Sequence, residues 1–205
     1  MPQNQIMNTT LSNARRQRVP AWTRSLVAAC LCGFVAIGAW AADPAPAPAP
    51  LQTIPRLDVQ RYLGTWYEIA KYPNRFQRQC ASDTQARYTL QADGQLVVLN
   101  RCRLANGEMT EAVGQARQVG AADSPRLKVR FAPAWLSFLP LVWGDYWVID
   151  LDADYQLVAV SEPRREYLWI LARQPQVDAA AYQALLGRLQ AQGLDLGRLE
   201  LSPQR

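Results

Sequence analysis

The sequence predicts an all-β domain, an eight-stranded up-and-down antiparallel barrel with a C-terminal α-helix packed on its outside. From Leu57 onward, short apolar and aromatic runs alternate with turn signals, which is typical of an antiparallel barrel rather than of alternating strands and helices. Asp93-Gly94 separates two of these runs, and both residues tolerate the positive φ of a tight hairpin. A barrel of this size is wide enough to enclose one small ligand.

The expected strands follow one another closely, and Asn106-Gly107 marks the turn after the third. They span residues 64–71, 86–90, 95–103, 110–119, 126–131, 145–151, 156–161 and 167–173. After them, Asp178 can cap a helix that Gly193 ends. The apolar residues of this helix fall on one face and are Tyr182, Leu185, Leu186 and Leu189. We expect this stripe to pack on the outer wall of the barrel; the alternative is contact with another subunit.

The first 41 residues have the pattern of an export signal. Arginines precede an apolar stretch over residues 25–39, and Ala39-Trp40-Ala41 matches the small-x-small pattern cut by signal peptidase. A retained membrane anchor is the alternative, but the stretch is shorter than the ~20 residues that span a bilayer. We expect a signal peptide at 1–41, an extended Pro/Ala-rich spacer at 42–54 and the barrel domain at 55–205.

Cleavage before Ala42 would release the domain into the periplasm. Val27-Ala28-Ala29-Cys30 indicates a second route, an outer-membrane lipoprotein anchored through Cys30. Only about five apolar residues separate Arg24 from Cys30, fewer than the ~7 of a usual signal core. The soluble periplasmic form is therefore our prediction, and lipid anchoring is its alternative.

Charge and composition exclude several functional classes. The chain has 22 basic and 17 acidic residues; residues 1–41 hold four arginines and no acid, so the remainder has 18 basic and 17 acidic residues. No basic stripe remains for nucleic acid. The chain has no histidine, which excludes His-dependent catalytic groups, His-bound zinc and His-bound haem. The close carboxylates Asp150, Asp152 and Asp154 lack the spacing of a calcium loop. We expect no cofactor and no metal.

Cys80 and Cys102 are the two cysteines outside the predicted signal peptide. In an oxidising compartment such a pair most often forms a disulfide. It would close a loop of about 23 residues and stabilise the fold by on the order of 3 kcal/mol. The alternative is a free nucleophilic thiol.

Three short motifs occur in order along the domain: Gly64-Thr65-Trp66, Asp154-Tyr155, and Arg173 at the end of the last strand. In these motifs the chain resembles the lipocalin family, and within it the bacterial outer-membrane and apolipoprotein D-like members, over about residues 55–202. The resemblance implies a barrel floor where an indole is capped by a guanidinium. It assigns structural roles there to Gly64, Trp66, Asp154, Tyr155 and Arg173.

The resemblance also implies which side chains line the cavity, because side chains along a strand alternate between interior and exterior. The expected ligand-binding residues on the strands are Glu68, Tyr88, Tyr146, Tyr167, Trp169 and Leu171. By the same alternation Ala70 faces inward above Glu68. A buried Glu68 needs a partner such as a tyrosine hydroxyl, or a raised pKa.

The uncharged segment 131–143 joins the fifth and sixth strands, and lipocalin topology puts it at the open mouth. It supplies two further expected ligand-binding residues, Trp135 and Phe138, which are costly to expose to water. They can cover a ligand as a lid, dip into a membrane surface, join two molecules as a homodimer, or simply pack on the barrel.

The resemblance implies non-enzymatic binding and transport or storage of a single-chain lipid, a lysophospholipid or a fatty acid, for maintenance of the outer membrane. Burying an acyl chain of some sixteen carbons gains on the order of 10 kcal/mol before ordering costs, so no reactive group is needed. Two other classes stay open. One is a lipocalin-type enzyme that uses Glu68 or a free cysteine on a hydrophobic substrate, and the other is an envelope interaction protein that uses the rim segment.

Overall fold

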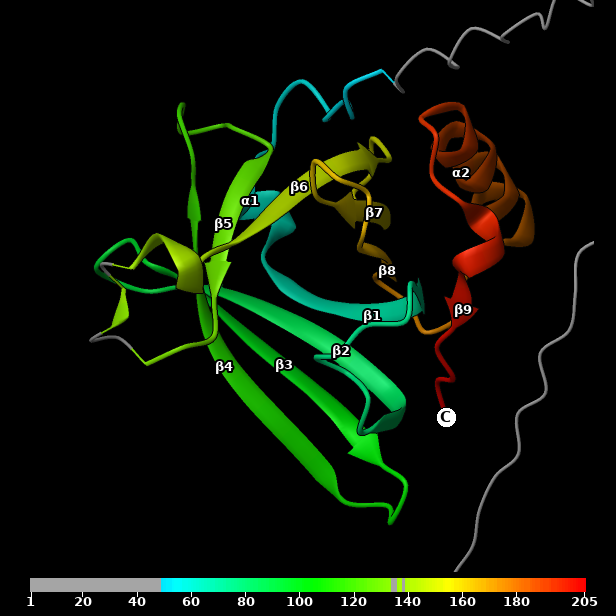
Figure 1. Ribbon diagram of the computed structural model, residues 1–205, viewed down its shortest axis with the longest axis horizontal. Coiled ribbons are helices and arrows are strands. Elements are labelled where there is room, and N and C mark those ends of the chain that lie inside the picture. The colour runs from blue at the N-terminus through cyan, green and yellow to red at the C-terminus, as the bar shows by residue number, and fades with distance from the viewer. Residues whose placement is uncertain (1–48, 134–135, 138) are drawn as a thin grey trace, which may run out of the picture. The chain divides into compact units, whose positions relative to one another are not determined.

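The computed structural model describes residues 49–133, 136–137 and 139–205. Within them, the strands form one antiparallel sheet in the order β2-β3-β4-β5-β6-β7-β8-β1-β9, and β1 also pairs with β2, which closes the barrel (Figure 1). The predicted eight-stranded barrel is confirmed. The predicted signal peptide, most of the spacer, Cys30, Trp135 and Phe138 lie outside the described residues.

The elements follow the predicted order, with four additions: α1, η2, η3 and β9. The strands are β1 (Gly64–Lys71), β2 (Cys80–Leu90), β3 (Leu96–Leu104), β4 (Met109–Gln118), β5 (Arg126–Arg130), β6 (Gly144–Leu151), β7 (Leu157–Ser161), β8 (Leu168–Ala172) and β9 (Glu200–Leu201). The helical segments are α1 (Val59–Tyr62), η2 (Pro140–Val142), α2 (Ala179–Ala191) and η3 (Leu196–Arg198). Among the described residues, no helix is both long and apolar enough to cross a bilayer.

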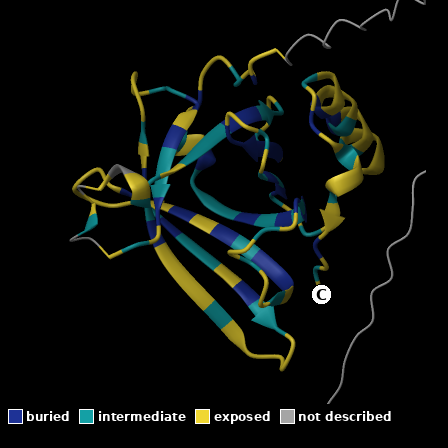
Figure 2. Cartoon of the chain, in the orientation of Figure 1, coloured by how far each residue is buried: buried dark blue, intermediate teal, exposed yellow. Residues whose placement is uncertain are grey.

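The barrel interior is packed at one end and open at the other. Along the inward side of β5 and the residue that follows it, exposure rises from 1% at Leu127 to 44% at Phe131. Figure 2 shows the buried segments in dark blue and the exposed segments in yellow, with much of β4 exposed. The buried inner cluster consists of Leu57, Tyr62, Trp66, Ala86, Tyr88, Leu96, Val98, Ala116, Leu127, Val148, Val158, Val160 and Leu171. The interior therefore has a solid floor and an accessible mouth.

A second apolar cluster lies between the barrel and α2, which sits outside the ring of strands (Figure 1). Asp178 accepts a hydrogen bond from the Ala181 amide at the start of α2, and Gly193 follows its end with φ +79°. The helix turns its predicted stripe to the barrel: Leu185 and Leu189 are fully buried, and Tyr182 and Leu186 pack on the same cluster. The predicted packing role of the helix is confirmed.

An ion pair also holds α2 to the barrel. The Arg188 guanidinium donates through Nε and Nη2 to the two carboxylate oxygens of Asp150, at 2.7 and 2.9 Å. Such a two-pronged pair adds orientation as well as attraction. Asp150 thus holds α2 against the barrel.

The alternation predicted for β1 fails at Ala70. The register of β1 against β8 shifts between Glu68 and Ala70, as in a β-bulge. One extra residue reverses the sides, so Ala70 belongs to the outer cluster with α2 instead of the interior. The inward prediction was wrong for Ala70, while Trp66 belongs to the inner cluster as predicted.

The C-terminal tail fills a gap between β1 and β2. These two strands pair only from Gly64↔Tyr88 to Tyr67↔Gln85, at the floor end. Nearer the mouth, the Ser202 amide donates to the Ile69 carbonyl and the Asp83 amide donates to the Pro203 carbonyl, both at 2.9 Å. Residues 200–205 therefore complete the wall where β1 and β2 part.

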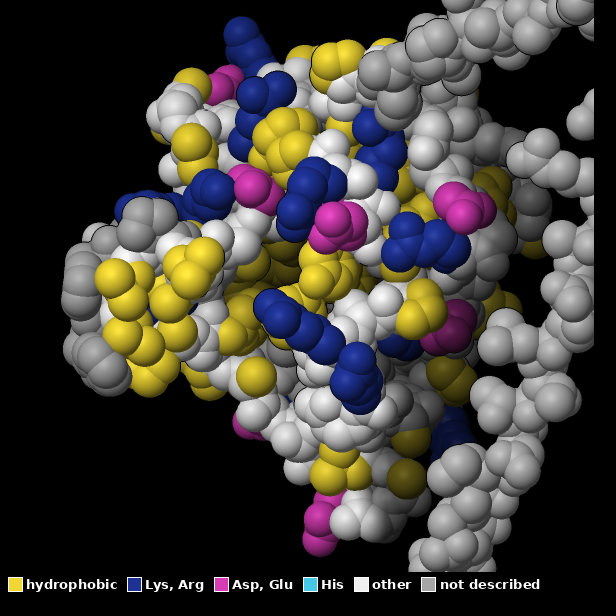
Figure 3. Space-filling view, viewed as in Figure 1, with side chains coloured by type: hydrophobic (Ala, Val, Ile, Leu, Met, Phe, Trp, Pro, Cys, Tyr) yellow, Lys and Arg dark blue, Asp and Glu magenta, His cyan; other side chains and the backbone are white. Residues whose placement is uncertain are grey.

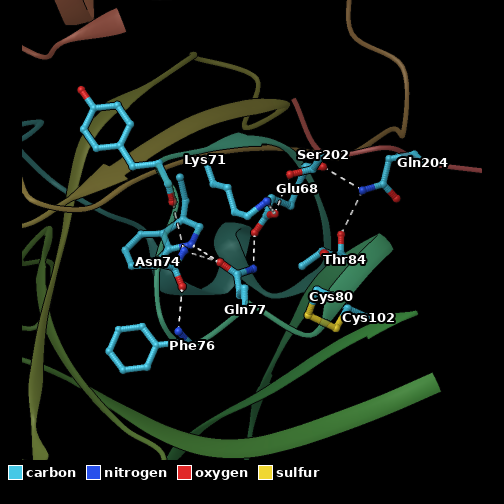
Figure 4. Close-up of polar contacts among 12 residues, drawn as sticks. Glu68, Lys71, Asn74, Phe76, Gln77, Cys80, Thr84, Cys102, Ser202 and Gln204 are labelled. Atoms are coloured by element: carbon cyan, nitrogen blue, oxygen red, sulfur yellow. Dashed lines mark hydrogen bonds and ion pairs between the residues drawn. A yellow bond between two sulfur atoms is a disulfide. The ribbon is translucent and has the colours of Figure 1, made fainter. Parts of the chain in front are cut away.

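Glu68 is buried in this seam, with 2% of its surface exposed. Its carboxylate accepts hydrogen bonds from Ser202 Oγ at 2.6 Å and Gln77 Nε2 at 2.5 Å, and Lys71 Nζ lies 3.7 Å away (Figure 4). Burial raises the pKa of Glu68, and these hydrogen bonds and the lysine offset part of that rise. The raised pKa is as expected, but Ser202 and Gln77 take the place of a tyrosine hydroxyl.

The predicted disulfide is confirmed. Cys80 at the start of β2 is bonded to Cys102 of β3, with their Cα atoms 5.5 Å apart (Figure 4). The bond ties together the mouth ends of two neighbouring strands, next to the seam that the tail closes. It also removes the free-thiol alternative for both residues.

We predict that Glu68→Gln changes the pH dependence of stability. The folded-state pKa of Glu68 is raised above 4.5, so the folded protein holds this proton more tightly than the unfolded chain does. The stabilisation from Glu68 is complete below pH 4.5 and is lost as pH rises through the folded-state pKa. Urea unfolding should show the stability advantage of the wild type over the variant shrinking across this window. A constant difference between the two proteins would contradict the assignment.

We predict that the double substitution Cys80→Ser/Cys102→Ser lowers the free energy of unfolding by about 3 kcal/mol. The reason is that no disulfide then restricts the unfolded chain between two residues that are 22 positions apart. Urea denaturation with and without a reductant measures this. The wild type should lose the same amount in reductant, and the double variant should not respond to it. A reductant-sensitive double variant would show that another effect is being measured.

Candidate ligand-binding site

The barrel floor is built around Trp66 and Arg173. The Arg173 guanidinium lies 3.9 Å from the centre of the Trp66 ring, and the indole Nε1 donates to the Tyr62 carbonyl at 2.8 Å. Arg173 also donates to the carbonyls of Thr65 at 3.0 Å and Arg61 at 2.7 Å. Gly64 permits this arrangement, because its φ is +95° and an added Cβ would lie 3.3 Å from the guanidinium.

The second motif forms the turn after β6. Tyr155 has φ +59°, its hydroxyl accepts from the Asp58 amide at 3.1 Å, and the Arg61 guanidinium lies 4.0 Å from its ring centre. Asp154 contributes backbone contacts, while the side chain of Asp152 accepts from the amides of Asp154, Gln156 and Leu157. The turn therefore buttresses α1 and the floor. Among the described residues, no group of three His, Cys, Asp or Glu side chains could hold a metal ion.

Three tyrosine hydroxyls meet just above the floor. The Tyr146 hydroxyl lies 2.7 Å from the hydroxyls of both Tyr62 and Tyr88. The Tyr62 ring packs against Trp66, with centroids 4.9 Å apart, and against Tyr88, with centroids 5.1 Å apart. Burial raises the pKa of Tyr88 to about 12 and the pKa values of Tyr62 and Tyr146 well above 10, so all three are neutral phenols. We call this group the hydroxyl cluster.

Tyr88 and Tyr146 were predicted from strand alternation, and the structure brings them together. Tyr62 was missed, because it lies on α1, a helix of four residues without a periodic pattern. Its position four residues before Trp66 is a usable signal in retrospect, since the indole hydrogen bond holds its carbonyl at the floor.

Small residues face inward above the hydroxyl cluster. They are Ala86 on β2, Ala112 and Gly114 on β4, and Gly144 on β6. A Cβ on Gly144 would meet only Val129, at 3.9 Å, so no side chain of β6 covers Tyr146 from the mouth. A Cβ on Gly114 would lie 2.7 Å from the Phe131 ring, which occupies that position instead. The small side chains at Ala86, Ala112 and Gly144 leave a cup between floor and mouth.

The space-filling view shows the result. Hydrophobic side chains lie recessed in the middle of this face, and Lys and Arg side chains border them (Figure 3). The recess lies within the ring of strands seen in Figure 1. An apolar centre with a basic border suits an amphiphile whose hydrocarbon chain enters first and whose anionic group stays outside.

An aromatic ladder forms one side of the cup. Tyr167 stacks on Trp169 with ring centroids 5.7 Å apart, and Phe76 lies 5.7 Å from Tyr167. Below them Leu171 is buried in the inner cluster. The three predicted residues 167, 169 and 171 therefore descend from mouth to floor on one side.

Gln77 connects this ladder to Glu68 (Figure 4). Its Oε1 accepts from Trp169 Nε1 at 2.9 Å and Asn74 Nδ2 at 2.7 Å, and its Nε2 donates to Glu68. Every polar atom of this amide side chain has a partner, so it braces the wall. Gln77 and Ser202 were missed because neither lies near Glu68 in an alternating pattern; they are 9 and 134 residues away.

The described part of the rim exposes apolar side chains. Phe76, Phe131 and Leu139 are 55%, 44% and 38% exposed, and Leu141 is 97% exposed. Arg75 lies 5.0 Å from the Phe76 ring centre. At the end of the rim segment lies Trp143. The guanidinium carbons of Arg117 and Arg130 lie 4.3 and 5.3 Å from the centre of its ring.

Known proteins match this architecture. Residues 57–204 match the family described as lipocalin-like domain. Temperature-induced lipocalin-1 of Arabidopsis thaliana is 40% identical, over 75% of this chain and 83% of that protein. Outer membrane lipoprotein Blc of Escherichia coli (strain K12) is 36% identical, over 84% and 92%, and apolipoprotein D of Mus musculus is 30% identical, over 72% and 77%.

The fold agrees with solved structures. Insecticyanin from the tobacco hornworm, Manduca sexta, superposes with a TM-score of 0.56 at 17% identity, covering 77% of this chain and 84% of that one. At this identity the match concerns the fold alone. The family match over nearly the whole described domain, together with the barrel, its Trp66–Arg173 floor and its open mouth, shows that the chain belongs to the lipocalins, a family of proteins that bind small hydrophobic ligands.

Proposed function

We propose that this protein binds and carries, or stores, a single-chain lipid, a fatty acid or a lysophospholipid, without chemical change. The observation that carries the proposal is the cup: small inward residues at 86, 112 and 144 leave space above an apolar floor, and an aromatic ladder borders it. One acyl chain buried there gains about 0.8 kcal/mol per methylene. Affinity then needs only burial and a place for the headgroup.

The rim supports placing the headgroup at the mouth. Arg75 beside the exposed Phe76 ring offers a guanidinium to a phosphate or carboxylate. The exposed apolar side chains of Phe131, Leu139 and Leu141 support contact of the mouth with a membrane surface, from which a lipid could enter. Trp135 and Phe138, which were expected to bind the ligand at this rim, lie outside the described residues.

The envelope is the proposed location. One relative is named an outer membrane lipoprotein, and residues 1–41 of this chain have the export pattern described above. We propose cleavage before Ala42 and a soluble periplasmic carrier that serves the outer membrane, with a lipid anchor at Cys30 as the alternative form.

Native mass spectrometry of the purified protein tests carriage. We predict one retained single-chain lipid per chain, released unchanged on denaturation. An altered lipid would indicate an enzyme, and a protein partner in an empty barrel would indicate an interaction protein. The denatured mass also reports the N-terminus: a chain beginning at Ala42 fits the proposal, and a diacylated Cys30 contradicts the soluble form.

We predict that Gly144→Phe weakens the binding of hexadecanoic acid while the protein stays folded. The new ring has room, because only Val129 is near the added Cβ, and it fills the space above Tyr146. The dissociation constant, measured by displacement of a fluorescent fatty acid, should be at least about tenfold larger for the variant. This corresponds to a loss of ~1.4 kcal/mol in binding free energy.

The matched control is Gly187→Phe on α2, where an added Cβ meets nothing within 4 Å. It should bind like the wild type. Normal binding by a folded Gly144→Phe protein would place the ligand outside the cup and contradict the proposal.

A further inference from the structure

Lys71, at the mouth end of β1, lies on the inward side of the barrel wall. Its Cα partner on β8 is Trp169, which packs on the inner cluster, and directly opposed residues share one face of a sheet. Ala70, the residue before it, belongs to the outer cluster, as alternation requires. The chain contains two lysines, and the other, Lys128, pairs with Asp145 on the outer face of the barrel. Lys71 is therefore the lysine that a ligand in the cup can meet.

The Lys71 ammonium pairs with Glu68, but only at long range. Nζ lies 3.7 Å from Glu68 Oε1, and Figure 4 shows the Lys71 side chain turned toward Glu68. The side chain of Lys71 is 15% exposed, whereas that of Glu68 is 2% exposed, so a ligand can reach the lysine while the carboxylate stays covered. An ammonium has three N–H donors, and one carboxylate oxygen takes one of them. The remaining donors can turn to a ligand.

Glu68 can give up this partner because its other contacts remain. Ser202 Oγ lies 2.6 Å from the same Oε1, and Gln77 Nε2 donates to Oε2 at 2.5 Å. If Oε1 takes up a proton from solvent, it can donate this proton to Ser202 Oγ, since a hydroxyl oxygen also accepts. Burial raises the pKa of Glu68, so protonation is easier here than for a carboxyl group in water. Protonated Glu68 leaves Lys71 with an unbalanced positive charge at the wall of the cup.

We propose that the Lys71 ammonium binds the anionic group of a single-chain lipid just inside the mouth, and that Glu68 takes up one proton as the anion replaces it. A sulfate, phosphate or carboxylate oxygen then becomes the ion-pair partner of the lysine. This inference rests on the proposed lipid binding. It names the ligand class as an amphiphile with an anionic group, and it identifies the side chain that selects that group.

The proposal fixes the sign of a pH dependence. A bound anion stabilises the protonated form of Glu68, so binding strengthens as pH falls and levels off below the pKa of Glu68 in the free protein. Histidine is the side chain that ordinarily titrates between about pH 5 and pH 8, and this chain has none. A pH dependence of anion binding in this range therefore points to a perturbed group such as Glu68.

Other charged groups surround the seam between β1 and β2. The hydrogen bond from Arg103 lowers the pKa of Asp83, so this carboxylate stays charged across the range. Glu200, opposite Lys71 on β9, is exposed to solvent and can be tested by substitution. The flanking loop and the tail add arginines, which stay charged throughout, and these are Arg75, Arg78 and Arg205.

Two probes with the same hydrocarbon chain test the proposal: dodecyl sulfate, whose charge is constant across this pH range, and uncharged dodecanol. Binding is measured on the purified protein by displacement of an uncharged fluorescent probe, far below the concentration at which dodecyl sulfate forms micelles. From about pH 8 to pH 5 the dissociation constant of dodecyl sulfate should fall by about five- to tenfold. The dissociation constant of dodecanol should stay the same.

The matched variants are Glu68→Gln and Glu68→Gln/Lys71→Met, because neither leaves an unpaired carboxylate in the seam. Glu68→Gln should bind dodecyl sulfate without the pH dependence. Adding Lys71→Met should weaken dodecyl sulfate by about tenfold and dodecanol by less than about twofold, since methionine keeps an apolar stem. Lys128→Met on the outer face and Glu200→Gln on β9 should behave like the wild type.

The outcomes separate this inference from the proposed function. If the loss of Lys71 weakens both probes equally, the lysine only shapes the cup and the inference is overturned. It is also overturned if dodecyl sulfate binds the wild type equally at every pH, or if its binding depends on Arg75 instead of Lys71. In each of these cases binding of dodecanol leaves the proposed lipid binding intact. If neither probe binds to the wild type, the proposed function itself fails. The pH comparison needs no variant, so it decides the matter even if the double variant does not fold.

Discussion

The Arg173 guanidinium over Trp66 is the contact on which the ligand-binding end of this barrel depends. Arg173 directly follows β8, and its guanidinium stacks on the Trp66 ring of β1. The same guanidinium donates hydrogen bonds to the Arg61 and Thr65 carbonyls, so it joins the sheet to α1. Because the same indole donates to the Tyr62 carbonyl, the position of Tyr62 follows from that of Trp66. The hydroxyl cluster is therefore placed by the floor rather than by the strands alone. In this way a contact between structural residues of the floor determines where the three tyrosine hydroxyls lie.

The wall of the cup depends on a different device. β1 and β2 separate above their floor ends, which would leave an open edge in the sheet. Residues 200–205 of the tail cover that edge, and Ser202 of the tail bonds to the buried Glu68 there. Exposed strand edges invite pairing with other chains, so a tail that occupies this edge protects the barrel. The cost of burying a carboxylate is offset by two hydrogen bonds and by Lys71, and the raised pKa of Glu68 shows that the offset is partial.

Much of the barrel could be predicted because local chemistry and the fold agree. β1 begins at Gly64 where the alternation begins, and Asp178 and Gly193 bracket α2 as their capping chemistry requires. The prediction of β2 began six residues late, at 86 instead of Cys80, because Ser82, Asp83 and Thr84 carry no apolar alternation. These polar side chains are buried by the tail and by Arg103, which come from distant parts of the sequence. Ala70 was predicted on the wrong side of the barrel wall, because a bulge is a property of strand pairing that the sequence of a single strand does not reveal. For the same reason the two-residue strand β9 has no signal of its own.

Glu68 and the hydroxyl cluster are both buried polar groups of this barrel, and they find their hydrogen-bond partners in different ways. At Glu68, each carboxylate oxygen has a donor, Gln77 uses both ends of its amide, and the contacts come from the loop and tail that close the wall. Such a group is complete without a ligand, and its energetic role is to hold the wall in one arrangement. The three phenols of the hydroxyl cluster bond to one another instead, and burial keeps all three neutral. Glu68 therefore depends on partners from the loop and the tail, whereas the phenols supply both the donors and the acceptors of their own cluster.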